Sequence, residues 1–317
     1  MPLDRRAERL LAMLAAVRDD GDAPEPPAAR REALRALAAM ADDGSAPAEI
    51  SDGAFEGPAG LVPVRLYAPT DAAERALPAL VFLHGGGWVA GDLDTHDGFC
   101  RRLCAASGWR VIAVDYRRAP EHPFPAALDD SLAATRWAAA NAAALGIDPA
   151  RLAVGGDSVG AGLAAAVALA SRDGDGPQLA LQLLVCPILE VGRAAGSRAA
   201  FAEGYFISRA AFARDLADYA PDLAADDPRL SPLRAASLAG LPPGMIHTAE
   251  FDPFRDEGEA YAARLGSAGV PIRAHRHDGM IHYFYALARA IPGAGEAATL
   301  IGAQMRELVE SGALAVP

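Results

Sequence analysis

The chain has 317 residues and a formal net charge of −12, and all 29 basic residues are arginines. The acidic balance excludes a nucleic-acid-binding protein because phosphate contacts need a basic surface, and the absence of lysine excludes P-loop, Schiff-base, pyridoxal-phosphate and Ser-Lys enzymes. No apolar run reaches the roughly 18 residues of a membrane span, and short apolar runs alternate with helical stretches, which predicts an α/β protein with a mostly parallel central sheet flanked by helices.

Residues 1–50 are predicted to form two helices outside this repeat, separated by a linker at residues 21–27. Apolar residues in the first helix recur at helical spacing, with charged residues on another face, which favours a helix over an export signal. These apolar residues are Leu3, Ala7, Leu10, Leu11 and Leu14.

A buried strand is predicted at residues 78–83, and it leads directly into the sequence HGGGW at residues 84–88. Three consecutive glycines leave their backbone N–H groups unshielded. An oxyanion hole requires this, because its donors must contact the negative charge of a tetrahedral intermediate. The alternative is a flexible glycine turn between a strand and a loop.

Two features of the next segment are interpreted as structural. Cys100 and Cys104 lie four residues apart on a predicted helix, and with Cys186 they make an odd three without metal-ligand spacing. We therefore expect buried or half-buried thiols in a reducing cytoplasm. Prolines at positions 120, 123 and 125 fix an extended path through residues 115–130, which we interpret as scaffold without a catalytic residue.

The sequence GDSVG at residues 156–160 follows an apolar run at residues 151–155 and precedes a small-residue stretch at residues 161–170. A short strand, a sharp turn with glycines on both sides of one serine, and a helix form the context of a nucleophile elbow. The glycines allow the serine to adopt a strained turn that lifts its hydroxyl above the edge of the sheet. Ser158 is therefore the candidate nucleophile.

Residues 192–235 are predicted to form a loop-and-helix insertion that also lies outside the α/β repeat. The insertion carries five aromatic residues, Phe201, Tyr205, Phe206, Phe212 and Tyr219. We expect about half of them to pack the insertion onto the rest of the protein.

The candidate acid follows a strand predicted at residues 244–249. Asp252 stands at the end of this strand, where Pro253 stops its continuation, and its carboxylate would hold an imidazole in one tautomer. Glu250, Asp256 and Glu257 are competitors, although Asp256 and Glu257 fit better in the first turn of the following helix.

The candidate base is one of seven histidines, and the chain order serine, acid, histidine that accompanies a nucleophile elbow leaves four of them. His247 lies within a predicted strand, and His275 and His277 lie in or at the end of the strand predicted at residues 270–276. His282 follows residues 278–281, which we predict to be a loop from which an imidazole reaches over the sheet toward the serine. We favour His282, with His277 as the alternative.

Five segments together resemble the bacterial hormone-sensitive-lipase family of α/β-hydrolase esterases. They are HGGGW at 84–88, DYRRAPEHPFPAALDD at 115–130, GDSVGAGLA at 156–164, DPFRDEG at 252–258 and HYF at 282–284. The resemblance implies an α/β-hydrolase fold with a helical cap. Its parts would be residues 1–50 as the N-terminal helical part of the cap, 51–191 and 236–317 as the two parts of the core, and 192–235 as the cap insertion.

The resemblance also implies a serine carboxylesterase that acts on a small-molecule ester and needs neither a metal nor an organic cofactor. Ser158 would attack the ester carbonyl, His282 would accept and return the proton, and Asp252 would orient His282. The oxyanion donors would be the N–H groups of Gly86, Gly87 and Val159. A lipase, an amide-directed or acyl-transfer hydrolase and a non-catalytic receptor of the same fold are the alternatives. The sequence leaves a monomer and a homodimer both open.

Two departures from the pattern of the family concern the site itself. Val159 stands where the family usually has a small residue, so we expect its side chain to narrow the acyl pocket and to favour acyl chains from acetyl to about hexanoyl. Tyr283 stands where the family usually has a glycine after the histidine, which leaves less room behind the imidazole.

Overall fold

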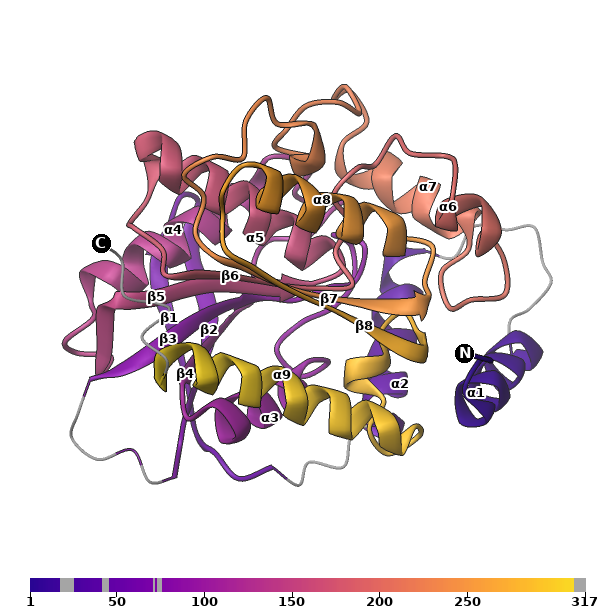
Figure 1. The fold of residues 1–317 in the computed structure, drawn as a ribbon, viewed down its shortest axis with the longest axis horizontal. Helices are drawn as coiled ribbons and strands as arrows, with labels where there is room; N and C mark the ends of the chain where they lie inside the picture. Colours follow the sequence, from indigo (N-terminus) through magenta and orange to yellow (C-terminus); the bar gives the residue numbers. More distant parts are fainter. Residues whose placement is uncertain (18–25, 42–45, 71, 73–75, 311–317) are drawn as a thin grey trace.

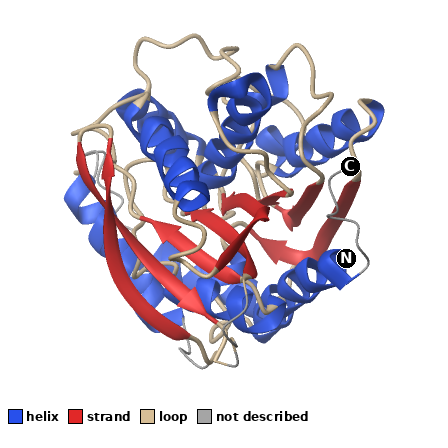
Figure 2. Cartoon of the chain, turned by 90° about the vertical axis from the view of Figure 1, so that its left-hand side faces the viewer, coloured by secondary structure: helices blue, strands red, loops and turns tan. Residues whose placement is uncertain are grey.

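The structure is a computed structural model that describes residues 1–17, 26–41, 46–70, 72 and 76–310. Its centre is an eight-stranded sheet with the strand order β1-β2-β4-β3-β5-β6-β7-β8. Strand β2 pairs antiparallel with both β1 and β4, and all other neighbours pair in parallel. Figure 2 shows this twisted sheet between helices. The predicted fold class is confirmed.

The strands follow the apolar runs of the sequence. Their bounds are β1 (Glu49–Gly57), β2 (Gly60–Ala68), β3 (Leu77–Leu83), β4 (Arg110–Val114), β5 (Ile147–Asp157), β6 (Leu181–Val185), β7 (Gly244–Phe251) and β8 (Ile272–Ile281). Every residue of β3 and β6 is buried. Parallel strands covered on both faces read as continuous apolar runs, which is why the sequence shows these strands clearly.

Helices cover both faces of the sheet (Figure 1). One face carries α3 (Asp97–Ser107) and α9 (Pro292–Glu310), and the other carries α4 (Ala126–Ala140), α5 (Val159–Ala170) and α8 (Arg255–Ser267). Side chains that alternate along β3 enter two separate apolar clusters, Val81 in one and Leu80 and Phe82 in the other.

Four helices lie at the carboxyl ends of β6, β7 and β8, where Figure 1 shows them grouped beside the sheet. They are α1 (Arg5–Val17), α2 (Pro27–Ala41), α6 (Ser197–Ala200) and α7 (Arg209–Tyr219). Short helical segments follow α5, precede β7 and follow β8, namely η1 (Ser171–Asp175), η2 (Pro232–Arg234) and η3 (Phe284–Ala286). The two predicted N-terminal helices are present, and residues 18–25, which hold most of the predicted linker, lie outside the described residues.

The end of β8 differs from the sequence prediction. Residues 278–281 are predicted as a loop, but β8 continues to Ile281, which pairs with Phe251 of β7. The N–H of Gly279 donates to Glu250 Oε2 at 2.7 Å, and the φ angle of Gly279 is +73°. The Asp-Gly pair is therefore an irregularity within a strand, not a turn that ends it. As a result, His282 is the first residue after β8.

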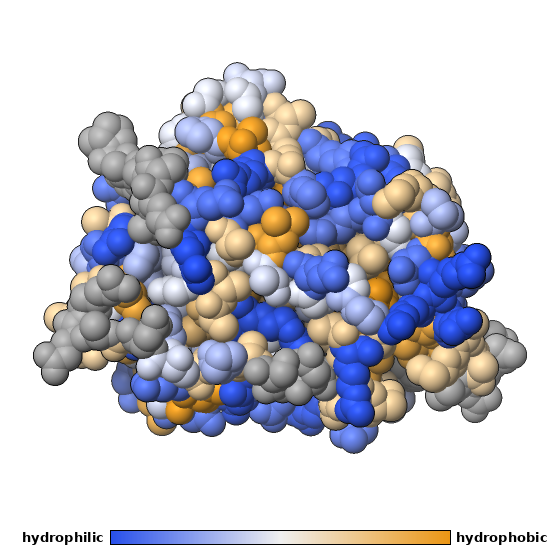
Figure 3. All heavy atoms as spheres, turned by 60° about the horizontal axis from the view of Figure 1, so that its bottom comes forward, coloured by the Kyte–Doolittle hydropathy of each residue, from blue (hydrophilic) through white to orange (hydrophobic). Residues whose placement is uncertain are grey.

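The surface of the protein carries scattered apolar side chains. Figure 3 shows the lower face of Figure 1, where hydrophobic atoms form small separate patches among hydrophilic ones. The large exposed hydrophobic residues are Met1, Met13, Met40, Leu61, Ile272 and Leu300. None of the helices in the described part of the chain has the length and apolar character that crossing a bilayer requires.

Candidate active site

Ser158 stands between the end of β5 and the start of α5, at φ +54° and ψ −123°. A serine in this region of the Ramachandran plot is strained, and strain of this kind is found where surrounding structure fixes the backbone. Glycines flank it because a Cβ at Gly156 would overlap the carbonyl oxygen of Leu83, and a Cβ at Gly160 would overlap the carbonyl oxygens of Leu83 and His84. The predicted strand, turn and helix are all present.

The three side chains proposed from the sequence as a triad lie together at the carboxyl edge of the sheet. His282 Nε2 is 2.9 Å from Ser158 Oγ, and His282 Nδ1 is 2.8 Å from Asp252 Oδ2. The other carboxylate oxygen of Asp252 accepts the N–H of Phe254 at 2.8 Å. All three side chains are buried, with residue exposures of 4% for Ser158, 2% for His282 and 0% for Asp252. A hydroxyl, an imidazole and a carboxylate therefore form one continuous hydrogen-bonded chain.

The competing carboxylates are bound elsewhere. Glu250 contacts the amino terminus of the chain at 2.7 Å, and Asp256 accepts the N–H of Ser197 at 2.8 Å. Glu257 pairs with Arg198 at 3.1 Å. Asp256 and Glu257 lie in the first turn of α8, as predicted. The structure thus brings Asp252, and none of these three, to the imidazole of the site.

The alternative histidine is also bound elsewhere. His277 Nε2 lies 3.0 Å from His247 Nδ1, and both residues are buried. Burial, together with the neighbouring His275, lowers the pKa of His277 to about 3. Burial also lowers the pKa of His247 well below its usual value. His277 therefore belongs to a cluster with His247 and His275 on β7 and β8 and is not hydrogen-bonded to Ser158.

The glycine loop that follows β3 borders the candidate nucleophile. Gly86 and Gly87 have φ angles of +119° and +66°, and both line the same cavity as Ser158. Within the described part of the chain, neither of their N–H groups donates to a backbone carbonyl outside the strands and helices. Val159 is the first residue of α5, where an N–H has no partner inside its own helix. These three N–H groups are free to bind an oxyanion.

The cavity that contains Ser158 and His282 has a volume of about 340 Å³. Ser158, His282 and the glycine loop form its floor, and residues of α1, α2 and α7 and of the segment before α7 form its walls. The wall residues are mostly apolar, among them Leu14, Leu34, Ile188, Phe206 and Phe212.

The expectation that Val159 narrows this cavity is wrong. Val159 is not one of the described residues that line the cavity, and its side chain is fully buried in the apolar cluster on the α5 side of the sheet. The residue contributes a backbone N–H at the start of α5, while its side chain packs into the core.

Comparisons with known proteins decide the family. The family profile described as the alpha/beta hydrolase fold matches residues 80–286. Esterase LipI of Mycobacterium tuberculosis is 41% identical over 78% of this chain and 78% of its own length. An ethyl acetate hydrolase of Pseudomonas putida is 38% identical over 94% of this chain and 92% of its own length. An ester-hydrolase from the metagenome of Lake Arreo, solved with a bipyridine phosphonate derivative, superposes with a TM-score of 0.92 at 42% identity over 97% of this chain and 99% of that one.

This chain is an α/β-hydrolase of the hormone-sensitive-lipase type. Its match spans more than half of the sequence and covers the glycine loop, the nucleophile elbow and both remaining triad positions. The resemblance inferred from the five motifs is confirmed.

Sequence reasoning missed a buried hydrogen-bond network under the glycine loop of the hydrolase. Asp157 is fully buried and accepts the N–H of Gly85 at 2.9 Å and the hydroxyl of Tyr285 at 2.5 Å, with His96 Nε2 at 3.3 Å. Burial raises the pKa of Asp157, but the charge and hydrogen bond of His96 and the hydrogen bond of Tyr285 outweigh burial and lower the pKa overall. Asp157 therefore ties the glycine loop to the elbow. The available signal was a charged residue at the end of a buried strand.

Residues 115–130 hold the other side of the glycine loop. Tyr116 donates its hydroxyl to the carbonyl of His84 at 2.6 Å, and the N–H of Ala119 donates to the carbonyl of Trp88 at 2.9 Å. Within the segment, the guanidinium of Arg117 donates two hydrogen bonds to Asp130, at 2.9 and 2.8 Å. The segment acts as scaffold, as expected, because the bonds of Tyr116 and Ala119 fix the backbone at both ends of the glycine loop and the Arg117–Asp130 pair holds the segment itself together.

The five aromatic residues of the 192–235 insertion all contact the rest of the hydrolase, so the expectation of about half was too low. Tyr219 stacks on Trp88 with ring centres 4.6 Å apart, and Phe206 stacks on Tyr283 at 5.4 Å. The remaining contacts are those of Phe201 and Tyr205 with Phe251 and of Phe212 with Phe254. Phe206 and Phe212 also line the catalytic cavity.

Tyr283 takes the conformation that its family position usually gives to glycine. Its φ angle is +67°, in the left-handed region that disfavours side chains. Its hydroxyl donates to the carbonyl of Thr95 at 3.1 Å, and its ring stacks on Phe206. These contacts offset the strain, and the tyrosine becomes part of the cavity wall next to His282.

An ion pair joins the two groups of helices that enclose the cavity. Arg30 of α2 pairs with Asp215 and, at 3.5 Å, with Asp218, both of α7. The side chains of Arg30 and Asp215 are 14% and 16% exposed. The carboxylate of Asp215 also lies directly on Gly87, where a Cβ would overlap it. Sequence patterns could not show this contact, since Arg30 and Asp215 lie on helices far apart in the chain.

One group among the described residues could ligate a metal ion. Cys186, Asp252 and His282 offer ligand atoms within 4.8 Å of one another. Burial and the nearby Asp252 carboxylate raise the pKa of Cys186 well above its usual value, so the thiol is neutral at neutral pH. A bound ion would need the thiolate and would replace the hydrogen bond between Asp252 and His282.

Proposed function

We propose that this hydrolase is a serine carboxylesterase that cleaves small water-soluble esters through an acyl-enzyme intermediate. The observation that carries the proposal is the chain from Ser158 Oγ through His282 to Asp252, with distances of 2.9 and 2.8 Å. Relatives named as an esterase, a carboxylic ester hydrolase and an ethyl acetate hydrolase support the same reaction class.

Acylation begins when Ser158 Oγ attacks the ester carbonyl carbon. His282 Nε2 accepts the hydroxyl proton, and the carboxylate of Asp252 stabilises the imidazolium that forms. The carbonyl oxygen becomes an oxyanion, which accepts hydrogen bonds from the N–H groups of Gly86, Gly87 and Val159. When the intermediate collapses, the bond to the leaving oxygen breaks, and His282 donates its proton to that oxygen.

Deacylation repeats these steps with water. His282 removes a proton from a water molecule, which attacks the carbonyl of the acyl-enzyme. The second tetrahedral intermediate uses the same three N–H groups, and its collapse returns the proton to Ser158 Oγ and releases the acid. The protein groups named here supply every proton transfer.

We further propose that short acyl chains are preferred, from acetyl to about hexanoyl. The bulky side chains of Phe206, Phe212 and Ile188 limit the cavity in place of Val159. We assign residues 1–50 and 192–235 to a cap, because α1, α2 and α7 supply cavity walls and the Arg30–Asp215 pair links α2 to α7. Three free buried cysteines support a reducing, cytoplasmic setting.

Two measurements test the proposal. The first is kcat/KM for p-nitrophenyl acetate, butyrate, octanoate and palmitate, with a maximum expected at acetate or butyrate. The second is intact-protein mass after treatment with a p-nitrophenyl phosphonate, which should add one phosphonyl group to the wild type and none to Ser158→Ala. No turnover of any ester would favour a non-catalytic receptor, and a maximum at octanoate or beyond would favour a lipase.

A further inference from the structure

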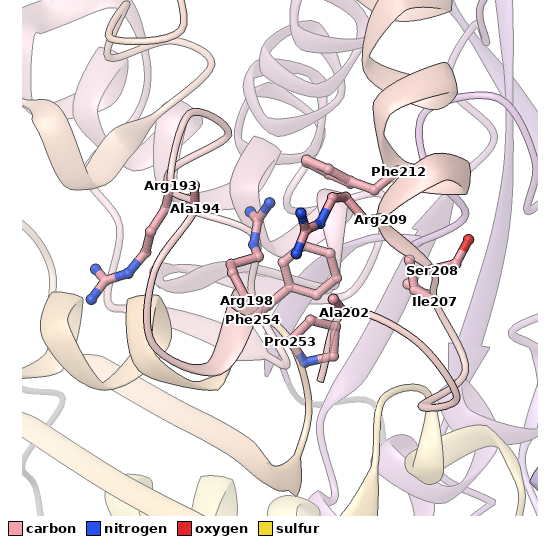
Figure 4. Close-up of a pocket in the computed structure, with 10 residues that line it drawn as sticks. All are labelled: Arg193, Ala194, Arg198, Ala202, Ile207, Ser208, Arg209, Phe212, Pro253 and Phe254. Atoms are coloured by element: carbon pink, nitrogen blue, oxygen red, sulfur yellow. The ribbon is translucent and has the colours of Figure 1, made fainter. Parts of the chain in front are cut away.

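A second, smaller cavity lies beside the catalytic one (Figure 4). It has a volume of about 100 Å³, and Ile207 and Phe212 line both cavities. Pro253 and Phe254, which directly follow the proposed triad acid, form part of its wall. The ring of Phe254 lies 5.2 Å from the ring of His282. The small cavity is therefore a neighbour of the site and not part of its floor.

Three arginines line the small cavity, namely Arg193, Arg198 and Arg209, and none of its ten lining residues is acidic. Arg193 pairs with Glu190 at 3.3 Å and Arg198 pairs with Glu257 at 3.1 Å, so among the described residues Arg209 is the arginine of this pocket whose charge no printed carboxylate contact offsets. Figure 4 shows the guanidinium groups of Arg198 and Arg209 directed toward the middle of the pocket and that of Arg193 directed away. Like charges that face one small cavity repel each other unless an anion lies between them.

Arg198 is held rigidly and still has an unused donor. Its guanidinium lies 4.4 Å from the ring centre of Phe212 and 4.3 Å from that of Phe254, and its Nη2 donates to Glu257 at 3.1 Å. Its side chain is only 10% exposed, yet Nε is buried without a hydrogen-bond partner. A buried donor without a partner is costly, so the guanidinium of Arg198 gains from an additional acceptor close to it.

Arg209 supplies the solvent-exposed counterpart. It is the first residue of α7 and is exposed, and the described residues offer it no ion pair. Its neighbour across the cavity, Arg198, forms an ion pair with Glu257. Burial raises the pKa of the Glu257 carboxyl to about 7. Near neutral pH the Glu257 carboxyl is therefore partly protonated, which leaves more of the positive charge of Arg198 uncompensated.

We propose that this pocket binds a carboxylate, and that the hydrolase accordingly favours esters that carry a free carboxylate, such as the half-esters of short dicarboxylic acids. The planar guanidinium groups match a carboxylate by shape as well as charge. The cavity volume of about 100 Å³ leaves room for one carboxylate group. The inference rests on the proposed esterase function and names a substrate class for it.

The test compares two esters of similar length, monoethyl succinate and ethyl butyrate, whose hydrolysis is followed by pH-stat titration. Arg209→Gln should lower kcat/KM for monoethyl succinate by about tenfold and leave ethyl butyrate within about twofold. Arg214→Gln is the matched control, because Arg214 is exposed on the same helix and does not line the pocket. Raising the salt concentration should reduce the preference of the wild type for the half-ester.

A second arm separates a carboxylate on the substrate from a free acid. Succinate and butyrate are added to the ethyl butyrate assay, and inhibition that weakens about tenfold in Arg209→Gln supports binding of the free acid at the same pocket. The carboxylate pocket is disproved if Arg209→Gln and Arg214→Gln behave alike toward both esters and both acids. In that case turnover of ethyl butyrate would still stand for the proposed esterase, whereas no turnover of either ester would overturn the esterase itself.

Discussion

The triad and the walls of the catalytic cavity are held in place in different ways. Ser158, Asp252 and His282 lie directly after β5, β7 and β8, and each is at most 4% exposed. The walls come instead from α1, α2 and α7; an ion pair joins α2 to α7, and a ring contact joins α7 to Trp88 of the core.

Substitutions in the triad and substitutions in the cavity wall should therefore have different effects. The triad geometry follows from the parallel order β5-β6-β7-β8, which brings three strand ends to one edge. Changes there should alter the chemical step. Changes in the wall should alter which ester binds and how well, because those side chains contact the substrate without transferring a proton.

The largest expected effect is the loss of the nucleophile. Ser158→Ala should lower kcat by roughly 10⁴-fold or more, since only the oxyanion donors and substrate binding would remain. Steady-state assays with p-nitrophenyl butyrate measure this decrease in kcat, and circular dichroism verifies that the variant is folded. A variant that keeps more than a tenth of the activity would place the nucleophile elsewhere.

His282, directly after β8, and His277, within β8, give a matched pair. His282→Ala should abolish turnover, because within the described part of the chain His282 is the hydrogen-bond partner that can accept the proton of the Ser158 hydroxyl. His277→Ala should keep kcat within about tenfold, because its imidazole contacts His247 and not the nucleophile. The reverse result would transfer the role of the base to His277.

The ion pair in the cavity wall should give an intermediate effect. Arg30→Met leaves the Asp215 carboxylate uncompensated beside Gly87, where it would repel the developing oxyanion, so kcat/KM should fall by about ten- to a hundredfold. Asp215→Asn removes that charge and should cost less. The double variant should therefore resemble Asp215→Asn, and an additive loss in the double variant would contradict this electrostatic account.

Acyl-chain length should respond to the wall and not to the elbow. Phe206→Ala enlarges the cavity and should raise kcat/KM for octanoate relative to butyrate by about tenfold. Val159→Ala should leave this ratio unchanged and lower the stability by roughly 1–3 kcal/mol, because Val159 is buried in the core. A shift of the chain-length optimum in Val159→Ala would show that the side chain of Val159 does limit the acyl pocket.

The smallest effect concerns stability and pH at the histidine cluster. The unfolded chain binds a proton on histidine near pH 6.5, whereas the pKa of His277 in the folded protein is about 3. Between these values the unfolded state binds more protons, so stability falls with falling pH by at most about 1.4 kcal/mol per unit for this histidine.

Urea unfolding between pH 4 and 7 measures this dependence. His277→Gln should reduce the slope, while His122→Gln, at an exposed position, should leave it unchanged. The carboxyl of Glu257 acts in the opposite sense, because its folded pKa of about 7 makes stability fall as the pH rises toward 7. Equal slopes in the wild type and His277→Gln would show that the cluster is not titrating as inferred.

The sequence by itself determined the fold class and the candidates for the triad, because these depend on local patterns. Apolar runs mark parallel strands, and the glycines around Ser158 mark a turn that no larger residue could make. It also determined the order of serine, acid and histidine. It could not determine where β8 ends, because Asp278-Gly279 is typical of a turn, whereas the bond from Gly279 to Glu250 and the pairing of Ile281 with Phe251 hold that segment beside β7.

Only the tertiary structure decided the surroundings of the triad. The network of Asp157, the contact of Asp215 with Gly87 and the arginine-lined pocket join residues that are distant in the sequence. The direction of the Val159 side chain was likewise undetermined, since a residue after the nucleophile can face the cavity or the core. Local patterns fix backbone shape, whereas the packing of helices against the sheet fixes which side chains meet.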